Sequence, residues 1–535
     1  MSTQPSSVAD LVPTRLRELV GAKTPWHRSL WQAGTILALR EVLEYADGFR
    51  SGAMNVEGLT FVCASAREQV ERDVGIGSQA TRDAMTTILA TGPDKQRGLY
   101  QDHVADSLLQ LIRRAERGYL RRWARAVRQG DVQLEDAELL ARLVAAHLLD
   151  AGFAADHVYG WLDAKADKPL ADLLELADEM CTEDARPFQV LVPFQSLPGE
   201  VADAAGDRFR TAEATEDFLA ARGLEKPPGR RGAGSLVFDV VAREPWSAVA
   251  AADIDVRRLA ARAVVGLTSK TVSAAGWAMV LDSVHGKWRP LKSRQQKDVL
   301  VTGIARHGLL IPKTRGSSAR DLDDAFELLA AVDTSTSWAS VAAIWAAVEG
   351  LLGRAADKGT LAADRMAAVV AAGYVRAELT DLATRMAKLE GPVSEDLRDD
   401  SQPFGVRLDH LFVAISSKQP LPSLTAEDGA AVLRLQSIVD DPEVLRRVES
   451  YLKASFRRLY QQRNLLLHGG RFDSVVLPMT MRSVPILVAA GLDRVVYAVS
   501  DVRDGVTPLG LAARAQNELA MLGSDGARQL HRLLD

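Results

Sequence analysis

The chain has 535 residues, of which 47% are hydrophobic and 25% are charged. This is the composition of an average soluble protein, and it excludes collagen, a coiled-coil rod and general disorder. There are 65 Lys and Arg against 70 Asp and Glu, so the net charge is −5 and a globally basic nucleic-acid coat protein is not expected. The two cysteines, Cys63 and Cys181, form no Cys-x-x-Cys pair, which excludes a zinc ribbon or a disulfide scaffold.

The N-terminus lacks a basic segment followed by an apolar one, and no run of 18 apolar residues occurs in the chain. We therefore expect a protein without a signal peptide or membrane contact. The few thiols fit a reducing compartment, so the expected location is the cytoplasm.

Residues 1–184 are predicted to form a helical N-terminal domain, because leucines recur with helical spacing over 106–123 and again over 136–153. Residues 185–315 are predicted to be a mixed α/β region. Its three candidate strands are Pro187–Phe194, Ser235–Val241 and Gly276–Val284.

From residue 320 to residue 535 the pattern is helical again, so the expected fold class is mainly α. The predicted helices cover residues 321–332, 338–356, 363–389, 428–439 and 442–468. Gly391–Pro403 is polar and bounded by proline, which predicts a loop.

The helix predicted over Pro442–His468 carries the most informative constellation. Asp441 can cap it, Pro442 suits its first position, and Gly469–Gly470 can end it. An apolar stripe follows its length: Leu445, Val448, Leu452, Phe456 and Leu459, resuming at Leu466. Arg463 takes a stripe position where a leucine is expected, and a buried guanidinium needs an anion or a wet groove.

His468 lies in the last turn of the same helix. Asn464 precedes it by four residues, so the two share a face and can hydrogen-bond. The C-terminal helix dipole favours the protonated imidazole. An oriented imidazole beside a permanent cation suits phosphodiester cleavage, because the cation neutralises phosphoryl charge while the imidazole moves protons.

The segment Arg463–His468 resembles the Arg-polar-x-x-x-His signature of the HEPN (higher eukaryotes and prokaryotes nucleotide-binding) superfamily. Upstream, the helix that carries Trp345 and Glu349 resembles one bacterial branch of this superfamily. Downstream, His468–Gly470 and Ala490–Arg494 fit the same branch. The resemblance covers roughly residues 320–535.

The resemblance implies a HEPN-like helical bundle and a metal-independent endoribonuclease that uses no cofactor. Arg463 would clamp the phosphoryl group, His468 would act as general acid or base, and Asn464 would orient His468. Active relatives pair two such helices across a homodimer, and many act in antiphage defence or as toxins. The implied partner is RNA, such as transfer RNA or another single-stranded loop, with a regulatory or trigger partner at the N-terminal regions.

Two further features are read from the residues themselves. Glu349 is predicted to lie toward the apolar face of its helix, where it needs a cation such as Arg463. Residues 450–482 carry six basic side chains against one acid, which predicts a basic surface for phosphates. Within it, Arg457, Arg458 and Arg471 are the candidate RNA contacts.

Other interpretations stay open. Arg463 can pair structurally with Glu349, His468 can be a helix-end residue without chemistry, and the basic set can be a solvated helix face. The chain is then a non-catalytic HEPN-like adaptor that binds RNA, nucleotide or protein, or a helical scaffold.

Overall fold

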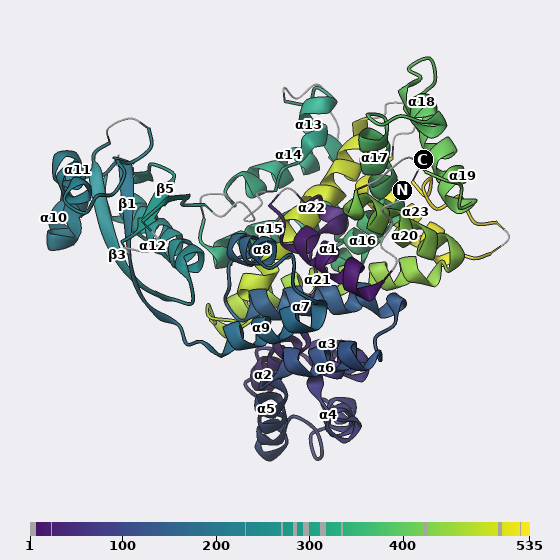
Figure 1. Ribbon diagram of the computed structural model, residues 1–535, viewed down its shortest axis with the longest axis horizontal. Helices are drawn as coiled ribbons and strands as arrows, with labels where there is room; N and C mark the ends of the chain where they lie inside the picture. Colours follow the sequence, from purple (N-terminus) through teal and green to yellow (C-terminus); the bar gives the residue numbers. More distant parts are fainter. Residues whose placement is uncertain are drawn as a thin grey trace.

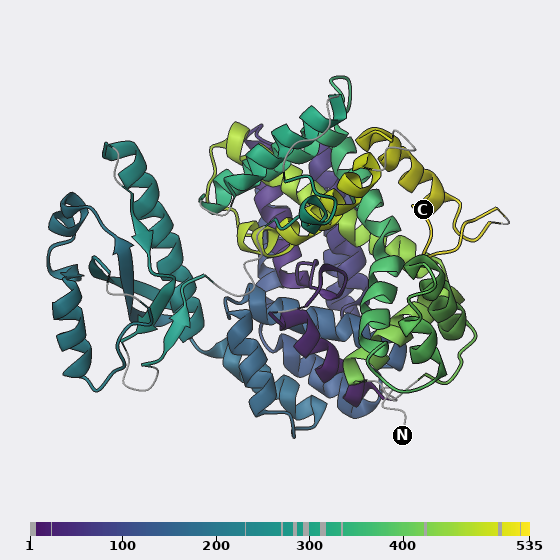
Figure 2. The ribbon, with the colours of Figure 1, turned by 90° about the horizontal axis from the view of Figure 1, so that it is seen from above.

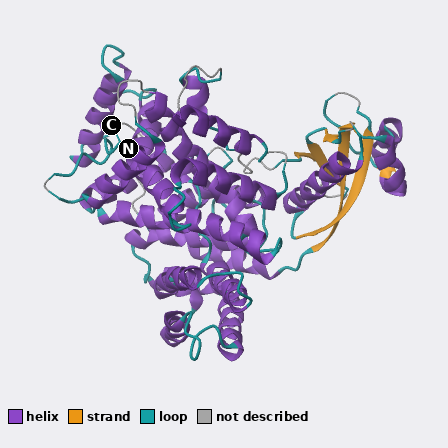
Figure 3. Cartoon of the chain, turned by 180° about the vertical axis from the view of Figure 1, so that it is seen from behind, coloured by secondary structure: helices purple, strands orange, loops and turns teal. Residues whose placement is uncertain are grey.

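The protein is mainly helical, with one small antiparallel sheet in its middle region, which confirms the predicted fold class (Figure 1, Figure 3). A computed structural model describes these residues: 7–22, 24–229, 232–268, 271–281, 286–292, 299–310, 317–332, 335–421, 425–500, 506–524 and 526–534.

The N-terminal region consists of helices that pack around a core of leucine, valine and alanine. They are α1 (Val8–Val20), η1 (Trp26–Arg28), α2 (Thr35–Arg50), α3 (Val56–Arg72), η2 (Val74–Ile76), α4 (Gln79–Thr91), α5 (Asp102–Glu116), α6 (Tyr119–Gln129), η3 (Leu134–Asp136), α7 (Ala137–Asp150), α8 (Ala155–Ala164) and α9 (Leu170–Thr182). Buried Asp73, between α3 and η2, joins α2 and α6, because it accepts hydrogen bonds from Thr35, Tyr119 and Trp123 at 2.6, 2.6 and 3.0 Å.

The middle region is a sheet with strand order β2-β3-β1-β5-β6, in which β4 also pairs with β1. Its elements are β1 (Arg186–Ser196), α10 (Gly199–Ala205), η4 (Gly206–Arg208), β2 (Phe209–Arg210), α11 (Ala212–Ala220), β3 (Gly234–Ala242), α12 (Pro245–Gly266), β4 (Ser273–Ala274), β5 (Trp277–Val280) and β6 (Trp288–Pro290). Alternating β1 residues such as Val190 and Val192 pack on α12, while Leu191 faces Leu219 of α11. Figure 2 shows this sheet beside the helical body.

All the regular secondary structure described in the C-terminal region is helical. It contains α13 (Thr302–Arg306), α14 (Ser317–Ala330), α15 (Ser337–Leu352), α16 (Leu361–Ala372), α17 (Tyr374–Met386), α18 (Pro392–Arg398), α19 (Phe404–Ser416), α20 (Ala426–Asp440), α21 (Glu443–Gly469), α22 (Leu477–Ser500) and α23 (Pro508–Ala520). Asp493 of α22 accepts hydrogen bonds from Thr302 and from the Gly303 amide, at 3.1 and 2.6 Å. α13 therefore packs with the C-terminal helices, although it lies before the predicted boundary at residue 315.

Three local predictions differ from the structure. The single helix predicted over residues 363–389 is two helices, α16 and α17, which meet at Gly373; a Cβ there would lie 2.9 Å from Arg494 Nε. The loop predicted over Gly391–Pro403 contains the short helix α18, which begins with Pro392 in its first turn. The strand predicted over Gly276–Val284 is the shorter β5, and residues 282–285 lie outside the described part of the chain.

Each helical region has its own core, and a few residues cross from one region into the core of the other. Trp31 of the N-terminal region is buried in the C-terminal core, and Ala430 and Leu465 are buried in the N-terminal core. The two helical regions therefore interlock at their boundary.

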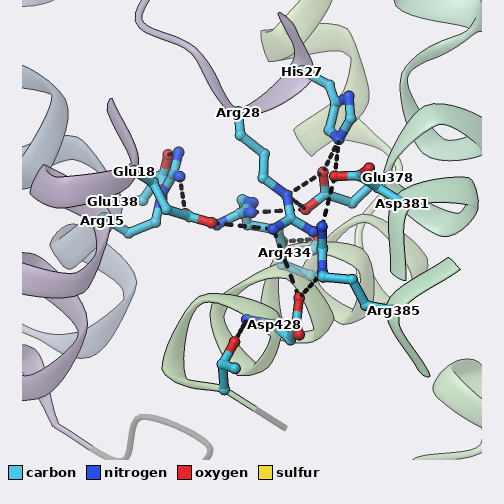
Figure 4. A network of polar contacts seen from close by, with 12 residues as sticks. Arg15, Glu18, His27, Arg28, Glu138, Glu378, Asp381, Arg385, Asp428 and Arg434 are labelled. Atoms are coloured by element: carbon cyan, nitrogen blue, oxygen red, sulfur yellow. Dashed lines mark hydrogen bonds and ion pairs between the residues drawn. The ribbon is translucent and has the colours of Figure 1, made fainter. Parts of the chain in front are cut away.

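A buried network of charges also joins the two regions (Figure 4). Its members are Arg15, Glu18, His27, Arg28, Glu138, Arg142, Glu378, Asp381, Arg385, Asp428 and Arg434. Glu378 lies at its centre with its side chain fully buried; its nearest nitrogens are Arg434 Nη2 at 2.7 Å, His27 Nε2 at 3.0 Å and Arg28 Nε at 3.1 Å. Burial alone raises the pKa of Glu378, but Arg434, His27 and Arg28 together hold it well below its usual range.

One helix, α22, is long and apolar enough to cross a membrane by length and composition. Most of its apolar stretch is buried against neighbouring helices, as in the core helix of a globular domain.

The central carboxylate gives a first prediction. Glu378→Gln keeps the shape of the side chain but leaves three buried basic groups without their main counter-ion, so we expect a loss of about 3–5 kcal/mol in the free energy of unfolding. The measurement is the denaturant midpoint of the purified chain. Glu57→Gln is the control: Glu57 pairs with Lys358 at 3.1 Å on the surface, where removal of one partner costs about 0–1 kcal/mol. Equal midpoints for the two variants would contradict the central role of Glu378.

His147 gives a prediction for pH. Its ring stacks on Tyr119 at 4.4 Å, and its pKa is lowered from 6.5 to about 4, mainly by burial and secondarily by nearby arginines. The unfolded chain takes up a proton as pH falls below about 6.5, whereas the folded chain does so only near pH 4. Stability is thus fully present above pH 6.5 and falls toward pH 4, by about 1–3 kcal/mol.

This loss is measured as the melting temperature between pH 7 and pH 4. His147→Phe keeps the ring contact without the titrating group, so its curve over this window is flatter. Both proteins still lose stability below pH 4, because groups such as Asp381 then titrate; despite its burial, His27 and Arg385 lower the pKa of Asp381 to about 2. A variant curve that parallels the wild-type curve would disprove the assignment to His147.

Candidate functional site

The candidate site lies at the C-terminal end of α21. The helix begins at Glu443, whose amide donates to the Asp441 carboxylate at 3.0 Å, and Gly470 ends it with a φ of 59°. Both ends thus agree with the prediction to within one residue. The stripe residues Leu452, Phe456 and Leu459 are fully buried in the C-terminal core.

Arg463 continues this stripe and is half-buried, while Leu465 and Leu466 beyond it are buried again. Its Nη1 donates a hydrogen bond to Asn464 Oδ1 at 3.0 Å. The guanidinium is thereby held toward the face of α21 on which Asn464 lies. His468 is exposed in the last turn, one helical turn beyond Asn464 on the same face.

The backbone positions of Arg463 and His468 lie on different sides of α21. An α-helix turns about 100° per residue, so two residues five apart are separated by about 140° around the axis. The predicted hydrogen bond between Asn464 and His468 is not among the contacts of the described residues, where Asn464 Oδ1 instead accepts from Arg463. A single chain therefore presents the two side chains on neighbouring faces of one helix end.

The structure places Glu349 differently from the prediction. Its side chain is exposed, and its carboxylate accepts a hydrogen bond from the indole N–H of Trp345 at 3.0 Å. Ring contacts of Trp338 with Phe472 and of Trp345 with Tyr460 show that α15 runs antiparallel to α21. Glu349 is thus one turn further from Arg463 than Trp345, and the expected ion pair between Glu349 and Arg463 is absent from the described contacts.

The predicted basic surface is largely neutralised by packing. Five of its six basic residues pair with a carboxylate: Lys453 with Glu449, Arg457 with Asp364, Arg458 with Glu41, Arg471 with Asp47, and Arg482 with Asp150, at 2.6–2.9 Å. Arg463 is the sixth, and within the described ranges it has no carboxylate partner.

Three of these pairs concern the candidate RNA contacts. Arg458 is buried, with its Nε and Nη2 on both oxygens of Glu41 at 2.8 and 2.9 Å. Arg457 is bidentate to Asp364, and Arg471 binds the more exposed Asp47. In this conformation these three side chains serve contacts within the chain.

Acidic side chains of α2 lie beside the C-terminal part of α21 and the segment that follows it. Glu41, Glu44 and Asp47 lie three residues apart, and buried Glu44 accepts a hydrogen bond from Ser474 at 2.7 Å. Burial raises the pKa of Glu44. The contacts between these acids and the end of α21 could not be predicted from the sequence, because the partners are more than 400 residues apart.

Sequence reasoning also missed an apolar set around the motif. Trp338, Leu467, Phe472 and Val475 have exposed fractions of 42%, 56%, 55% and 44%. The Trp338 and Phe472 rings meet at 5.3 Å. Phe472 and Val475 lie two and five residues after Gly470, which ends α21, so the sequence does contain a signal for them.

The downstream motif residues have packing roles. A Cβ on Gly491 would lie 2.2 Å from Met366 Sδ, so this glycine lets α22 approach α16 closely. Asp493 binds the start of α13, as described above. In the part of the chain that is described, no group of three or more His, Cys, Asp or Glu side chains could hold a metal ion.

The ion pair between Arg458 and Glu41 gives a third prediction. Arg458→Ala leaves the buried Glu41 carboxylate without its partner, so we expect a loss of about 3–5 kcal/mol in the free energy of unfolding. Arg471→Ala is the matched control, since its pair with Asp47 is partly exposed and is expected to contribute about 0–1 kcal/mol. The melting temperatures of the two variants measure the difference. An Arg458→Ala variant as stable as wild type would contradict the importance of this ion pair for folding.

The site is thus a helix end with one half-buried arginine that lacks a carboxylate partner in the described structure, an amide that fixes it, an exposed histidine and an apolar rim. Comparison with known proteins finds no matching family, no matching curated protein and no matching solved structure. A function for this chain is therefore argued from its own residues and their arrangement.

Proposed function

We propose that the protein is a metal-independent endoribonuclease whose active residues are Arg463, Asn464 and His468. The proposal rests on the surroundings of Arg463, which differ from those of the neighbouring basic residues. Among the basic residues of this segment it is the one that, within the described structure, no carboxylate neutralises. A half-buried guanidinium held by a neutral amide keeps its charge available for an anion.

The proposed chemistry uses these groups in distinct roles. Arg463 binds the phosphoryl oxygens of the scissile phosphate and stabilises the charge that develops there. His468 takes the proton of the ribose 2′-hydroxyl, whose oxygen attacks the neighbouring phosphorus in line. The bond from phosphorus to the 5′-oxygen breaks, that oxygen receives a proton, and a 2′,3′-cyclic phosphate remains.

A second copy of the chain would complete the site. Within one chain, the backbone positions of Arg463 and His468 lie about 140° apart around α21, and the described contacts include none between the two side chains. When two α21 ends face each other, Arg463 of one protomer can lie opposite the partner's His468. The exposed rim of Trp338, Leu467, Phe472 and Val475 supplies apolar surface for this contact.

The N-terminal region would restrain the nuclease or receive its trigger. α2 neutralises Arg458 and Arg471 through Glu41 and Asp47, so RNA can contact these arginines only when α2 moves away. RNA contacts of Arg457 likewise require its pair with Asp364 to open. We propose RNA, such as transfer RNA or another single-stranded loop, as the substrate, and antiphage defence or toxin action as the role.

The test is RNA cleavage by the purified chain in EDTA, with total RNA and transfer RNA as substrates. We expect wild type to produce 2′,3′-cyclic phosphate ends, and Arg463→Ala and His468→Ala to lose about 100-fold or more of the rate. His410→Ala, which removes another exposed histidine on α19, is the control and should cleave as wild type does.

Cleavage that is equal in wild type and in both variants, or absent from all of them, would contradict the proposal. Light scattering under the cleavage conditions gives a second check, because an active protein that remains monomeric would exclude the shared site.

A binding adaptor is the second candidate. The separation of Arg463 from His468 and the neutralised basic surface favour it, since binding needs no proton transfer. RNA binding that survives His468→Ala without any cyclic-phosphate product would identify this function.

A further inference from the structure

Two adjoining cavities lie between the N-terminal helices α3 and α7 and the C-terminal helices α20 and α21. The smaller has a volume of about 210 Å³ and the larger of about 670 Å³. Four residues line both cavities: Arg72, Leu139, Arg142 and Tyr451. The wall that the cavities share therefore carries two guanidinium groups and a phenol, contributed by both helical regions.

Arg142 is the buried cation of this wall, with 7% of its surface exposed. Its Nε donates to Glu138 at 2.7 Å, and its guanidinium lies over the Trp31 ring at 5.4 Å. Its Nη1 is buried and has no hydrogen-bond partner in the described structure. A buried donor without a partner is unfavourable, and a bound acceptor would remove this cost.

The smaller cavity also holds an unpaired acceptor. Gln69 lines this cavity, and its Oε1 is buried without a hydrogen-bond partner among the described residues. The rings of Phe61, Trp31 and Tyr451 form other parts of the wall. The cavity thus combines aromatic surface with an amide that needs a donor, as a site for a nucleobase does.

The charges around the junction favour an anion. Arg72 is exposed at the end of α3 and makes no ion pair in the described part of the chain. Four acids also line the two cavities: Glu68, Glu135, Asp136 and Glu138. Glu138 is already matched by Arg15 and Arg142, which hold its pKa far below the usual range despite its burial. The guanidinium of Arg72 and the Nη1 of Arg142 are therefore available to bind a ligand.

We propose that these joined cavities bind a nucleotide. The base lies in the smaller cavity, where an exocyclic amine donates to Gln69 Oε1. The phosphates lie at the junction, where Arg142 and Arg72 bind them and the larger cavity leaves room for more than one phosphate. A ligand held in this way touches both helical regions at once, so it stabilises their association.

The proposal is tested by isothermal titration calorimetry of the full chain, without RNA, against ATP, GTP, AMP and tripolyphosphate. We expect at least one of the nucleotides to bind more tightly than tripolyphosphate and to raise the melting temperature. Arg72→Ala should weaken binding about tenfold or more, and Gln69→Leu should remove the preference for the nucleotide over tripolyphosphate. Both residues lie on a partly exposed helix, so the variants should fold.

Arg67→Ala is the matched control, because Arg67 lies on the same helix, pairs with Glu71 at 3.2 Å and does not line either cavity. It should bind as wild type does. The proposal is overturned if no nucleotide binds at millimolar concentration, if tripolyphosphate binds as tightly as every nucleotide, or if Arg72→Ala and Gln69→Leu bind like wild type. Because the measurement involves no RNA, its outcome is independent of the proposed nuclease activity.

Discussion

The structure depends on charges that are buried between its two helical regions. Glu378 of α17 is surrounded by Arg28 and His27 of the N-terminal region and by Arg434 of α20. Moving such groups out of water costs several kcal/mol per ion, and only a complete set of partners offsets that cost. Either region alone would expose an incomplete half of this network. The network therefore fixes how the two regions pack against each other. It thereby also fixes the geometry of every site that is built from residues of both regions.

The same packing explains why the basic segment is less positive in space than along the chain. Counted over residues 450–482, the basic side chains exceed the acids by five. In the folded chain, carboxylates of α2, α7 and α16 pair with these basic side chains. Arg458, for example, forms an ion pair with Glu41. A count within a window measures charge near a residue in sequence, whereas binding depends on charge near it in space. Arg463 differs from its basic neighbours, because within the described residues it contacts the Asn464 amide and no carboxylate.

Local features were predictable and distant ones were not. The ends of α21 and the buried stripe through Phe456 follow from spacing and capping residues, which act over a few positions. The break between α16 and α17 coincides with Gly373, a residue that weakens a helix, but the helical periodicity continues across it and therefore predicted one helix. Glu349 shows a similar limit: its spacing from Trp345 was read as burial, but the indole N–H holds the carboxylate at the surface. The cavities lined by Arg142 could not be predicted, because their walls come from four helices that are distant in the sequence.

The boundary between the helical regions thus contains both the neutralised arginines and the proposed nucleotide site. α3 contributes Arg72 to the cavities and follows α2, whose acids hold Arg458 and Arg471. α21 lines both cavities through Tyr451 and carries Arg463 three turns further on. A ligand at the cavities can influence the helix end only if it binds more tightly to one packing of α2 and α3 against α21 than to another. The arrangement meets the structural requirement for such coupling, since one continuous helix and one shared interface connect the two places.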